Sequence, residues 1–351
     1  MGAAGGQKLR IAQFNLENFF VYIDHPLDMS LEKISEGEWQ KHSISIFDNK
    51  SLQHLRDIAK CMRDINADIY LLCEVGGVES INNFAKYFLN DEYRAFSIEG
   101  NSDRGIDLAY LVRKSLGFKF DLITHKNRAL DFLYPHERQS ILSGHLNSKH
   151  SLRFSRDVLE LRVFNAQIGG SIERPCLILL NVHLKSQLDK ENIDPQGKDR
   201  RKAELEKLVE IYLEISQEFN NQVPVLIAGD FNGIASKRNT DPEFSSLYAK
   251  TSLQDVFDIA GLSTEKRITH LQFPPYGKPW FKQFDYIFVS PSLQNQILKE
   301  ETFVYRFKDE FGFEISLPSS LNEKKRLASD HYPVVTSFTL PEKLFDKDKM
   351  R

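Results

Sequence analysis

Short apolar runs alternate with longer stretches of helical periodicity along most of this chain. Apolar residues recur every three to four positions between residues 51 and 65, which is typical of an amphipathic helix. The same spacing predicts helices at 78–88 and 199–219. The apolar runs between them have the length of buried strands. They lie at 8–15, 68–73, 108–112, 159–163, 177–180, 225–228, 284–289 and 332–340.

Strand–helix–strand units occur in both halves of the chain, with no Pro-, Gly- or Ser-rich linker between the halves. This pattern predicts one α/β domain of two packed sheets with outer helices. We expect the domain to span 8–340, with flexible ends at 1–7 and 341–351, and to be a monomer. Residues 19–48 show no clear period, so this segment, with Trp39, should either border the functional site or cover a sheet edge.

Polar side chains stand at the ends of most of the predicted strands. Isolated charges are rarely buried unless they are paired or bind a metal ion. One acid at a strand end is usually a turn or a helix cap, but the recurrence at several strand ends predicts a hydrolytic site on the rim of a sheet. The residues are Asn15, Glu17, Glu74, Asn181, His183, Asp230, Asn232, Asp285, Asp330 and His331.

These residue types indicate metal-assisted phosphodiester hydrolysis. An oxygen-rich set without thiolates suits hard cations such as Mg²⁺, with Mn²⁺ able to substitute. Magnesium uses one or two carboxylates and leaves its other positions to water and substrate phosphate. Two histidines on separate strands can supply the acid and the base. Because no serine or cysteine nucleophile is apparent, we expect an activated water to attack.

Composition sets limits on partners and compartment. The chain is 41% hydrophobic and 27% charged, as in ordinary globular proteins. Its net charge of −3 argues against a generally basic nucleic-acid binder but permits a local basic groove. No apolar run reaches the roughly 18 residues of a transmembrane helix. The three scattered cysteines predict neither disulfides nor zinc. We expect a cytoplasmic protein if the chain is complete, and an exported one if its Gly-rich start replaces a leader.

Seven short motifs together resemble the deoxyribonuclease I and exonuclease III-type endonuclease/exonuclease/phosphatase superfamily. They occur in the family order and span nearly the whole chain, at 14–18, 72–75, 155–157, 181–183, 229–232, 284–287 and 329–333. Each motif alone is weakly specific, whereas the ordered set is strongly specific. The resemblance implies a four-layered α/β sandwich of two mixed sheets flanked by helices. It also implies internal pseudo-two-fold symmetry and a site where the two sheets open.

The resemblance further implies roles in metal binding. Glu74 would be the main metal carboxylate, with Asn15, Glu17 and Asp330 around it. The pair formed by Asp230 and Asn232 would hold the scissile phosphate and the attacking water, or a second metal ion.

It implies catalytic and phosphate-binding roles as well. His331 would be the general base, oriented by Asp285, and His183 would stabilise or protonate the leaving oxygen. Asp107 would orient His183. Arg156 matches a family arginine that contacts phosphate, and we add two further candidate phosphate-binding residues, Asn181 and Lys185.

Departures from the family pattern bear on the substrate. The inositol-phosphatase branch has Cys-Asp-Arg where this chain has Phe284-Asp285-Tyr286, and exonuclease III-type enzymes have Asn in place of His183. That histidine is shared with deoxyribonuclease I-like and sphingomyelinase-like branches. We therefore expect a DNA or RNA substrate first, a sphingomyelinase-type lipid second and a small phosphoester third. A non-catalytic binding module of the same fold is the alternative outside enzymes.

Two segments of the chain bear on whether the substrate is a nucleic acid. The stretch 136–156 could follow a phosphate backbone or form a solvated hairpin. Its basic residues are Arg138, His145, Lys149, His150, Arg153 and Arg156. Aromatic residues before Asp285 could stack on bases, insert into lipid or simply pack in the fold; they are Tyr276, Trp280 and Phe281.

Overall fold

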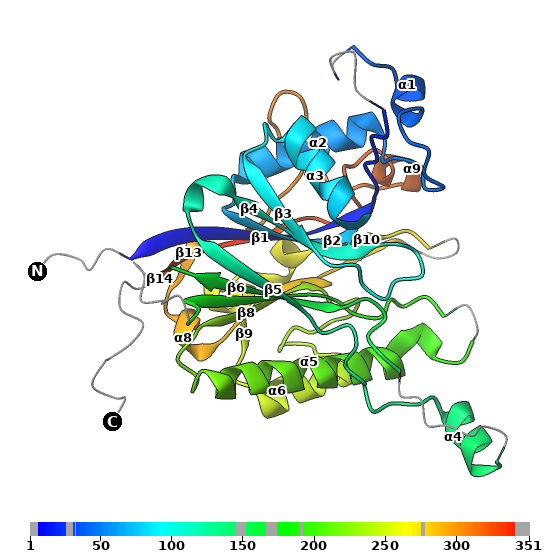
Figure 1. Cartoon of the computed structure of the whole chain (residues 1–351), viewed down its shortest axis with the longest axis vertical. Helices are drawn as coiled ribbons and strands as arrows, with labels where there is room; N and C mark the ends of the chain where they lie inside the picture. The colour runs from blue at the N-terminus through cyan, green and yellow to red at the C-terminus, as the bar shows by residue number, and fades with distance from the viewer. Residues whose placement is uncertain are drawn as a thin grey trace, which may run out of the picture.

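Two six-stranded sheets pack together at the centre of the computed structural model (Figure 1). The structure describes residues 6–25, 31, 33–144, 152–165, 174–189, 192–274 and 278–340. The first sheet has the order β13 (Ile297–Val304), β14 (Val334–Leu340), β1 (Gln7–Phe19), β2 (Ile69–Val75), β4 (Asp107–Arg113), β3 (Tyr93–Ser97). The second has the order β5 (Lys119–Thr124), β6 (Val158–Phe164), β7 (Leu177–His183), β8 (Val225–Asp230), β12 (Asp285–Val289), β9 (Gln254–Asp255).

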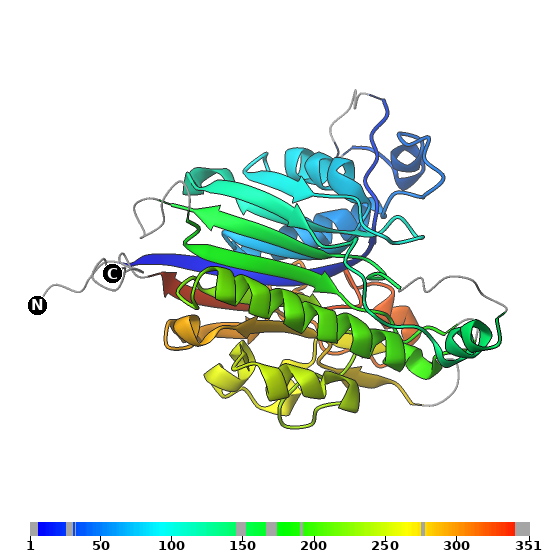
Figure 2. The ribbon, with the colours of Figure 1, turned by 60° about the horizontal axis from the view of Figure 1, so that its bottom comes forward.

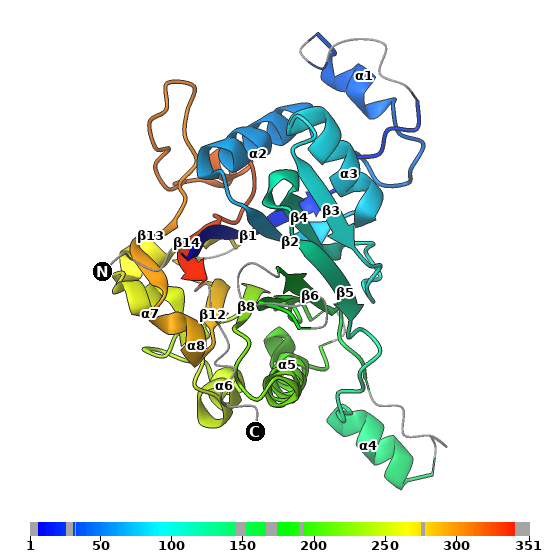
Figure 3. The ribbon, with the colours of Figure 1, turned by 60° about the vertical axis from the view of Figure 1, so that its left-hand side comes forward.

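Helices cover the outer face of each sheet, which gives four layers (Figures 1 and 3). On the first sheet lie α2 (Leu52–Ile65) and α3 (Gly77–Phe88), and on the second lie α5 (Lys198–Glu218) and α6 (Ser245–Lys250). The long α5 follows the strands of its sheet (Figure 2). The shorter elements are α1 (Glu36–Gln40), α4 (Pro135–Leu142), α7 (Val256–Ala260), α8 (Pro291–Gln294), α9 (Leu321–Lys324), β10 (His270–Gln272) and β11 (Trp280–Lys282).

Both sheets repeat one pattern of pairings. From β3 through β13, and from β5 through β9, the pairs are antiparallel, antiparallel, parallel, antiparallel and antiparallel. The two ends of the fold meet in the first sheet, where Gln7 is the register partner of Leu340. The predicted α/β sandwich of two mixed sheets flanked by helices is therefore confirmed.

The predicted helices form because their apolar stripes face the sheets. Helix α2 begins after Ser51, whose hydroxyl accepts a hydrogen bond from the backbone N–H of His54, and ends at the left-handed residue Asn66. In α5, Leu205 and Leu208 are fully buried in a second apolar cluster beneath the outer sheet face. Burying one such side chain contributes about 1.5–3 kcal/mol.

The N-terminal segment departs from the prediction. Strand β1 continues to Phe19 instead of ending at Asn15, and Gln7, expected in a flexible end, is its first residue. The pairing of β1 with β2 shifts register between Asn15 and Phe19. This irregularity lets the strand carry its polar cluster past the sheet edge. Gly6 is the other described residue of the expected flexible ends. Residues 1–5 and 341–351 lie outside the described residues.

The segment 19–48 covers the fold in its described part. Trp39 on α1 is fully buried, its Nε1 donates to the carbonyl of Lys50, and its ring packs edge-on against Phe88. It therefore does not border a site. The three cysteines are buried and free, as small core residues should be. None of the described helices combines the length and the apolar composition needed to cross a membrane.

Candidate active site

Three adjacent strands of the second sheet carry a row of ionisable side chains at one edge of the sheet. His183 on β7 is the register partner of Asp230 on β8, and Asp285 on β12 is the partner of Asp230 on its other side. Gly229 makes this row possible, because its φ is +153° and a Cβ there would lie 1.8 Å from the carbonyl oxygen of Val182. Only glycine allows β8 to approach β7 this closely.

Strand β1 of the first sheet brings two amides to the same row. Asn15 Nδ2 donates to Asp230 Oδ2 at 3.1 Å, and Gln13 Nε2 donates to Asp285 Oδ1 at 3.0 Å. Because they are two residues apart on a strand, Gln13 and Asn15 point to the same face. Gln13 was missed in the sequence, although a buried polar residue two positions before Asn15 in an apolar strand was a usable signal.

His331 lies between the two acids of this row. Its Nδ1 is 2.7 Å from Asp285 Oδ2, and its Nε2 is 3.8 Å from Asp230 Oδ2. An ionised carboxylate can only accept, so Asp285 keeps a proton on Nδ1. The backbone N–H of His331 donates to Ser329 Oγ, which donates in turn to the carbonyl of Asn15. The imidazole is thus held in place with Nε2 directed toward Asp230.

Glu74 and His183 complete the cluster. Glu74 comes from β2, and its Oε2 accepts a hydrogen bond from the backbone N–H of Asn18 at 2.9 Å. His183 Nε2 is 4.0 Å from Glu74 Oε1 and 3.6 Å from Asp230 Oδ2. Both sheets therefore contribute to one site, which holds Glu74, Asp230, His183 and, across Asp230, His331.

Left-handed backbone conformations gather around these residues. The φ angles of Glu17, Glu74 and Asn232 are 52°, 64° and 53°. Such conformations cost on the order of 1–3 kcal/mol each and are typical of functional sites. Asn232 donates its backbone N–H to Asp230 Oδ1 at 2.8 Å and its side-chain NH₂ to the carbonyl of Leu184 at 3.0 Å. Its amide oxygen remains available to a ligand.

Burial and mutual charge shift the pKa values of the central pair. Burial raises the pKa of Asp230 to about 7, with Asp285 and Glu74 acting in the same sense and His331 opposing them. Burial alone would lower the pKa of His331, but the negative charges of Asp285 and Asp230 outweigh it and raise that pKa well above its ordinary value. A site this rich in buried negative charge favours a bound cation.

The second histidine has the opposite electrostatic character. Burial lowers the pKa of His183 well below its ordinary value, and the positive charge of Arg156 adds to the effect. His183 is therefore neutral at pH 7 and can donate a hydrogen bond from one ring nitrogen. Asp330 is different again: burial acts to raise its pKa, but His331 and other positive neighbours, including Lys324, lower it.

The donor set fits a hard divalent cation. Asp230, Asp285 and His331 each offer one possible ligand atom within 4.8 Å of the others, as do His270, Asp330 and His331. Asp230 is 2% exposed, and among the described residues no lysine or arginine lies within 4 Å of its carboxylate. A buried carboxylate is stabilised by a bound cation, and carboxylate and amide oxygens are the ligands that Mg²⁺ prefers.

Two buried or partly buried lysines, which the sequence analysis missed, hold the outer carboxylates. Lys50 Nζ donates to the carbonyl of Glu17 at 2.7 Å and lies 3.9 Å from its Oε2. Lys324 Nζ donates to Asp330 Oδ2 at 2.9 Å. Two of the predicted metal ligands, Glu17 and Asp330, thus have lysine partners. Asp230, which has no lysine or arginine within 4 Å in the described part of the chain, is therefore the favoured metal carboxylate. Glu74 is the next candidate: it faces Asp230 across His183, and Arg104 Nη2 is 4.0 Å from its Oε2.

Two predicted site residues are placed elsewhere. Asp107 Oδ1 accepts a hydrogen bond from the backbone N–H of Gly100 at 2.7 Å, while His183 Nδ1 has no hydrogen-bond partner among the described residues. The structure thus does not bring Asp107 to His183. Asn181 is fully buried and donates to the carbonyls of Leu72 and Ala109. Its NH₂ group joins the two sheets and is not free to bind phosphate.

The described residues of the basic stretch 136–156 are not gathered in one place. Arg138 is exposed on α4, which projects from the body of the molecule (Figures 1 and 3). Arg156, in contrast, is buried close enough to Glu74 and Asp230 for their charges to act on it. The predicted contributors His145, Lys149 and His150 lie outside the described residues.

Aromatic rings line the His331 side of the site. The ring of His270 lies 4.5 Å from that of His331 and stacks on Phe284 at 4.9 Å, and Trp280 packs edge-on against both His270 and Phe284. Trp280 is partly exposed, whereas Phe281 packs against Phe273. The predicted contributor Tyr276 lies outside the described residues. His270 was missed in the sequence, because nothing in its local pattern separates it from a structural histidine.

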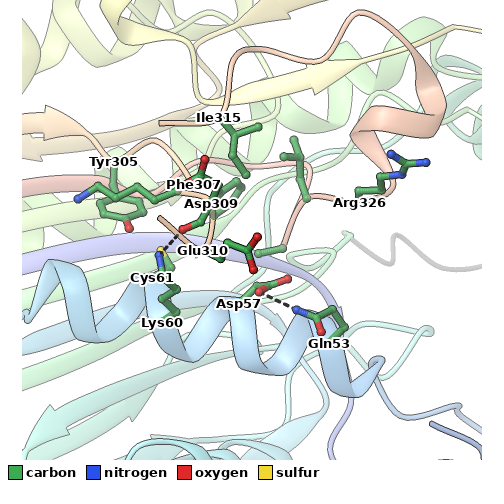
Figure 4. A pocket seen from close by; sticks show the side chains of 13 residues that line it. Gln53, Asp57, Lys60, Cys61, Tyr305, Phe307, Asp309, Glu310, Ile315 and Arg326 are labelled. Carbon is green, nitrogen blue, oxygen red and sulfur yellow. Dashed lines mark hydrogen bonds between the residues drawn. The ribbon is translucent and has the colours of Figure 1, made fainter. Parts of the chain in front are cut away.

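A separate pocket of about 400 Å³ lies between α2 and the segment 305–328 (Figure 4). Charged residues of both signs line it, among them Asp57, Lys60 and Arg326, together with apolar Phe307 and Ile315. None of the candidate catalytic residues lines this pocket. It is therefore distinct from the site described above.

The sequence matches no protein-family model and no curated protein. Solved structures do match in three dimensions. The D. rerio TDP2 complexed with single strand DNA product is 16% identical, with a TM-score of 0.54 over 95% of this chain and 99% of that one. The human Nocturnin catalytic domain with bound sulfate anion is also 16% identical, with a TM-score of 0.54 over 95% and 94%.

An endonuclease/exonuclease/phosphatase family protein from Bacteroides thetaiotaomicron is 17% identical, with a TM-score of 0.52 over 96% of this chain and 99% of that one. These likenesses extend over almost the whole length of both partners. They show that this chain has the endonuclease/exonuclease/phosphatase fold, also called deoxyribonuclease I-like. The resemblance recognised in the seven sequence motifs is thereby confirmed at the level of the fold.

Proposed function

We propose that this protein is a divalent-metal-dependent phosphodiesterase that hydrolyses DNA or RNA by attack of an activated water. The observation that carries the proposal is the convergence of two histidines and at least three acids, from both sheets, at one edge of the sandwich. A binding module would not need an oriented histidine–carboxylate pair beside a buried acid. The pKa values of the two histidines are also shifted in opposite directions, so the two side chains can take different roles at one pH.

In this proposal His331 is the general base. Its Nδ1–H is held by Asp285, so Nε2 is free to take a proton from water once it is unprotonated. Asp230 lies on the same side and positions the water, with the amide oxygen of Asn232 next to it. Neutral His183 donates a hydrogen bond to the phosphate oxygen where negative charge develops.

Glu74 and Asp230, with the Asn232 amide oxygen, are the residues that would hold a divalent cation. Bound there, Mg²⁺ or Mn²⁺ would supply charge stabilisation to the phosphate oxygens and the leaving group. Asn15 keeps Asp230 in place, and its own Oδ1 accepts the backbone N–H of Glu17 at 3.0 Å. Glu17 and Asp330 would then shape the outer side of the site through their lysine partners.

The side chains around the candidate site favour a nucleic acid as the substrate. Arg104 Nη2 lies 4.0 Å from Glu74 Oε2, and Arg156 is buried nearby, so cations are placed beside the candidate metal site. The partly exposed Trp280 packs edge-on against His270, and Lys282 Nζ lies over its ring at 4.6 Å, so an aromatic ring and a cation stand together where a nucleotide could bind. The D. rerio TDP2 of the same fold is complexed with a single strand DNA product, which supports this choice.

A lipid phosphodiesterase remains the second candidate because of one observation. Phe311 and Phe313 are 77% and 72% exposed, on a hairpin whose strands pair at Lys308 and Glu314. Exposed aromatic side chains beside lysines suit the interface of a membrane. This hairpin lies next to α2, since Lys60 Nζ donates to a carbonyl in its turn.

A substrate panel with a salt series separates the two functions. We expect cleavage of single-stranded DNA or RNA oligonucleotides with Mg²⁺, slowing about tenfold or more between 50 and 200 mM salt, because cationic contacts to several phosphates release counterions. The Phe311→Ser/Phe313→Ser double variant should cleave oligonucleotides like the wild type. Salt-independent turnover of sphingomyelin vesicles alone, lost in that double variant, would replace the nuclease by a lipid phosphodiesterase.

A further inference from the structure

A cavity of about 350 Å³ adjoins the candidate active site, and basic side chains outnumber acidic ones in its lining. Four basic side chains face it: Arg104, Arg156, Lys185 and Arg200. It borders the site directly, because Arg104 Nη2 is 4.0 Å from Glu74 Oε2 and Lys185 follows two residues after His183.

Two of the three acids in the same lining are engaged by backbone N–H groups. Asp194 accepts the backbone N–H groups of Asp199 and Arg200, both at 3.0 Å, and so caps the start of α5. Asp189 accepts the backbone N–H groups of Ile193 and Asp194. Asp103, the remaining acid, makes no ion pair within 4 Å in the described part of the chain. These acids therefore shape the rim of the cavity. The carboxylates that pair with its cations, Glu204 with Arg200 at 3.5 Å and Glu74 with Arg104 at 4.0 Å, lie outside the lining.

Two of the arginines keep unused hydrogen-bond donors. Arg156 is 7% exposed, its Nη1 donates to Ser155 Oγ at 3.2 Å, and its Nε has no hydrogen-bond partner in the part of the chain that the structure describes. Among the described residues, Arg200 Nε is also buried without a hydrogen bond, and the nearest carboxylate, Glu204, is 3.5 Å away. Glu204 is occupied behind the cavity, where it accepts the backbone N–H groups of Ser155 and Lys185.

The cations also act unfavourably on one another. Burial lowers the pKa of Lys185, and the positive charge of Arg156 lowers it further. Like charges crowded around a cavity, with buried donors unused, are stabilised when an anion enters. Arginine forks match the geometry of phosphate oxygens. The side chain of Tyr134 also lines the cavity and offers a ring beside the anion site.

We infer that this cavity binds a second phosphate group of the substrate, one that flanks the scissile phosphate. This inference rests on the proposed function and narrows it: the preferred substrate carries at least two phosphates. The second phosphate is either the next phosphodiester of a polynucleotide or a terminal phosphomonoester. Lipid phosphodiesters that carry a single phosphate would leave the cavity unfilled.

Binding tests the cavity without any need for catalysis. Thymidine 3′,5′-bisphosphate is titrated calorimetrically into the full-length protein in EDTA, at low salt. We expect Arg200→Gln and Lys185→Gln to weaken binding about tenfold or more each, since each removes a charge-assisted contact to phosphate. Lys202→Gln, an exposed charge on the same helix, should bind like the wild type. Equal binding by all four proteins, or no binding by the wild type, would overturn the inference.

Turnover measurements compare the two possible forms of the second phosphate, a neighbouring phosphodiester and a terminal phosphomonoester. The substrates are a dinucleotide with one phosphodiester, the same dinucleotide with a 5′- or 3′-terminal phosphate, and a trinucleotide with two phosphodiesters. We expect kcat/KM to rise about tenfold with a second phosphate, and this gain to vanish in Arg200→Gln but persist in Lys202→Gln. Equal rates on all substrates would remove the subsite and leave the phosphodiesterase standing. Absence of any turnover would remove the proposed function, while the calorimetry still decides the cavity.

Discussion

Replacing His331 by alanine is expected to lower metal-dependent phosphodiester hydrolysis by about 10²–10⁴-fold, the usual contribution of a general base. The reason is geometric: Nε2 of His331 is the ring nitrogen left free beside Asp230, because Nδ1 is 2.7 Å from Asp285. The measurement is kcat with saturating Mg²⁺ on a chromogenic diester, with circular dichroism to show that the variant is folded.

His136→Ala is the matched control, because His136 is exposed on α4, which projects from the body of the molecule (Figure 3). It should hydrolyse the diester at the wild-type rate. A folded His331→Ala protein that kept nearly the wild-type kcat would show that another group takes the proton, and the assignment of His331 as base would be withdrawn.

Asp285→Asn should lower kcat/KM by at least about 10²-fold and should also shift the dependence of kcat/KM on pH. Although burial acts to lower the pKa of His331, the charge of Asp285 is the largest of the effects that raise it. In the wild type, kcat/KM should therefore rise with pH and level off only on the alkaline side of neutrality. Without the Asp285 charge the pKa of His331 falls, so the rising limb should move to lower pH even though the maximum drops.

The same pair has a consequence for stability. Because the folded pKa of His331 is raised, its protonation contributes stability that is fully present below its ordinary pKa and is lost as pH rises through the folded value. Asp285→Asn should reduce that dependence on pH. Asp121→Asn, an exposed acid on β5, is the control and should change neither profile. A rising limb that stayed at the same pH in Asp285→Asn would separate this carboxylate from the titration of His331.

Much of the architecture could be predicted from sequence because burial is periodic. Helices α2 and α5 have apolar stripes, and strands such as β7 and β8 begin with an uninterrupted apolar run before their polar site residues. The edge strands β3, β5 and β13 could not be predicted, since half-exposed strands carry mixed residues and no clean alternation. The continuation of β1 through Glu17 was also hidden, because a left-handed residue breaks the pattern of a strand.

Some contacts of the site could likewise be predicted from the sequence, and others could not. Motif order was enough to predict that Glu74, Asp230 and His331 lie together, because each stands at the end of a core strand. Gln13 and Lys50 could not be predicted as their partners, since such contacts depend on how the two sheets pack, not on local sequence. Predicting Asp107 beside His183 failed for a related reason: sheet position alone does not fix which backbone N–H a carboxylate will accept.

The central proposal is metal-dependent hydrolysis, and one measurement tests it most directly. The purified protein is incubated with bis-(p-nitrophenyl) phosphate in Mg²⁺ or Mn²⁺, then in excess EDTA, and then with the metal restored, with His331→Ala as the background control. We expect turnover with either metal, loss of that turnover in EDTA, and recovery when metal is added back. Equal turnover with metal and in EDTA would contradict the proposed role of Glu74 and Asp230, and with it the proposed function.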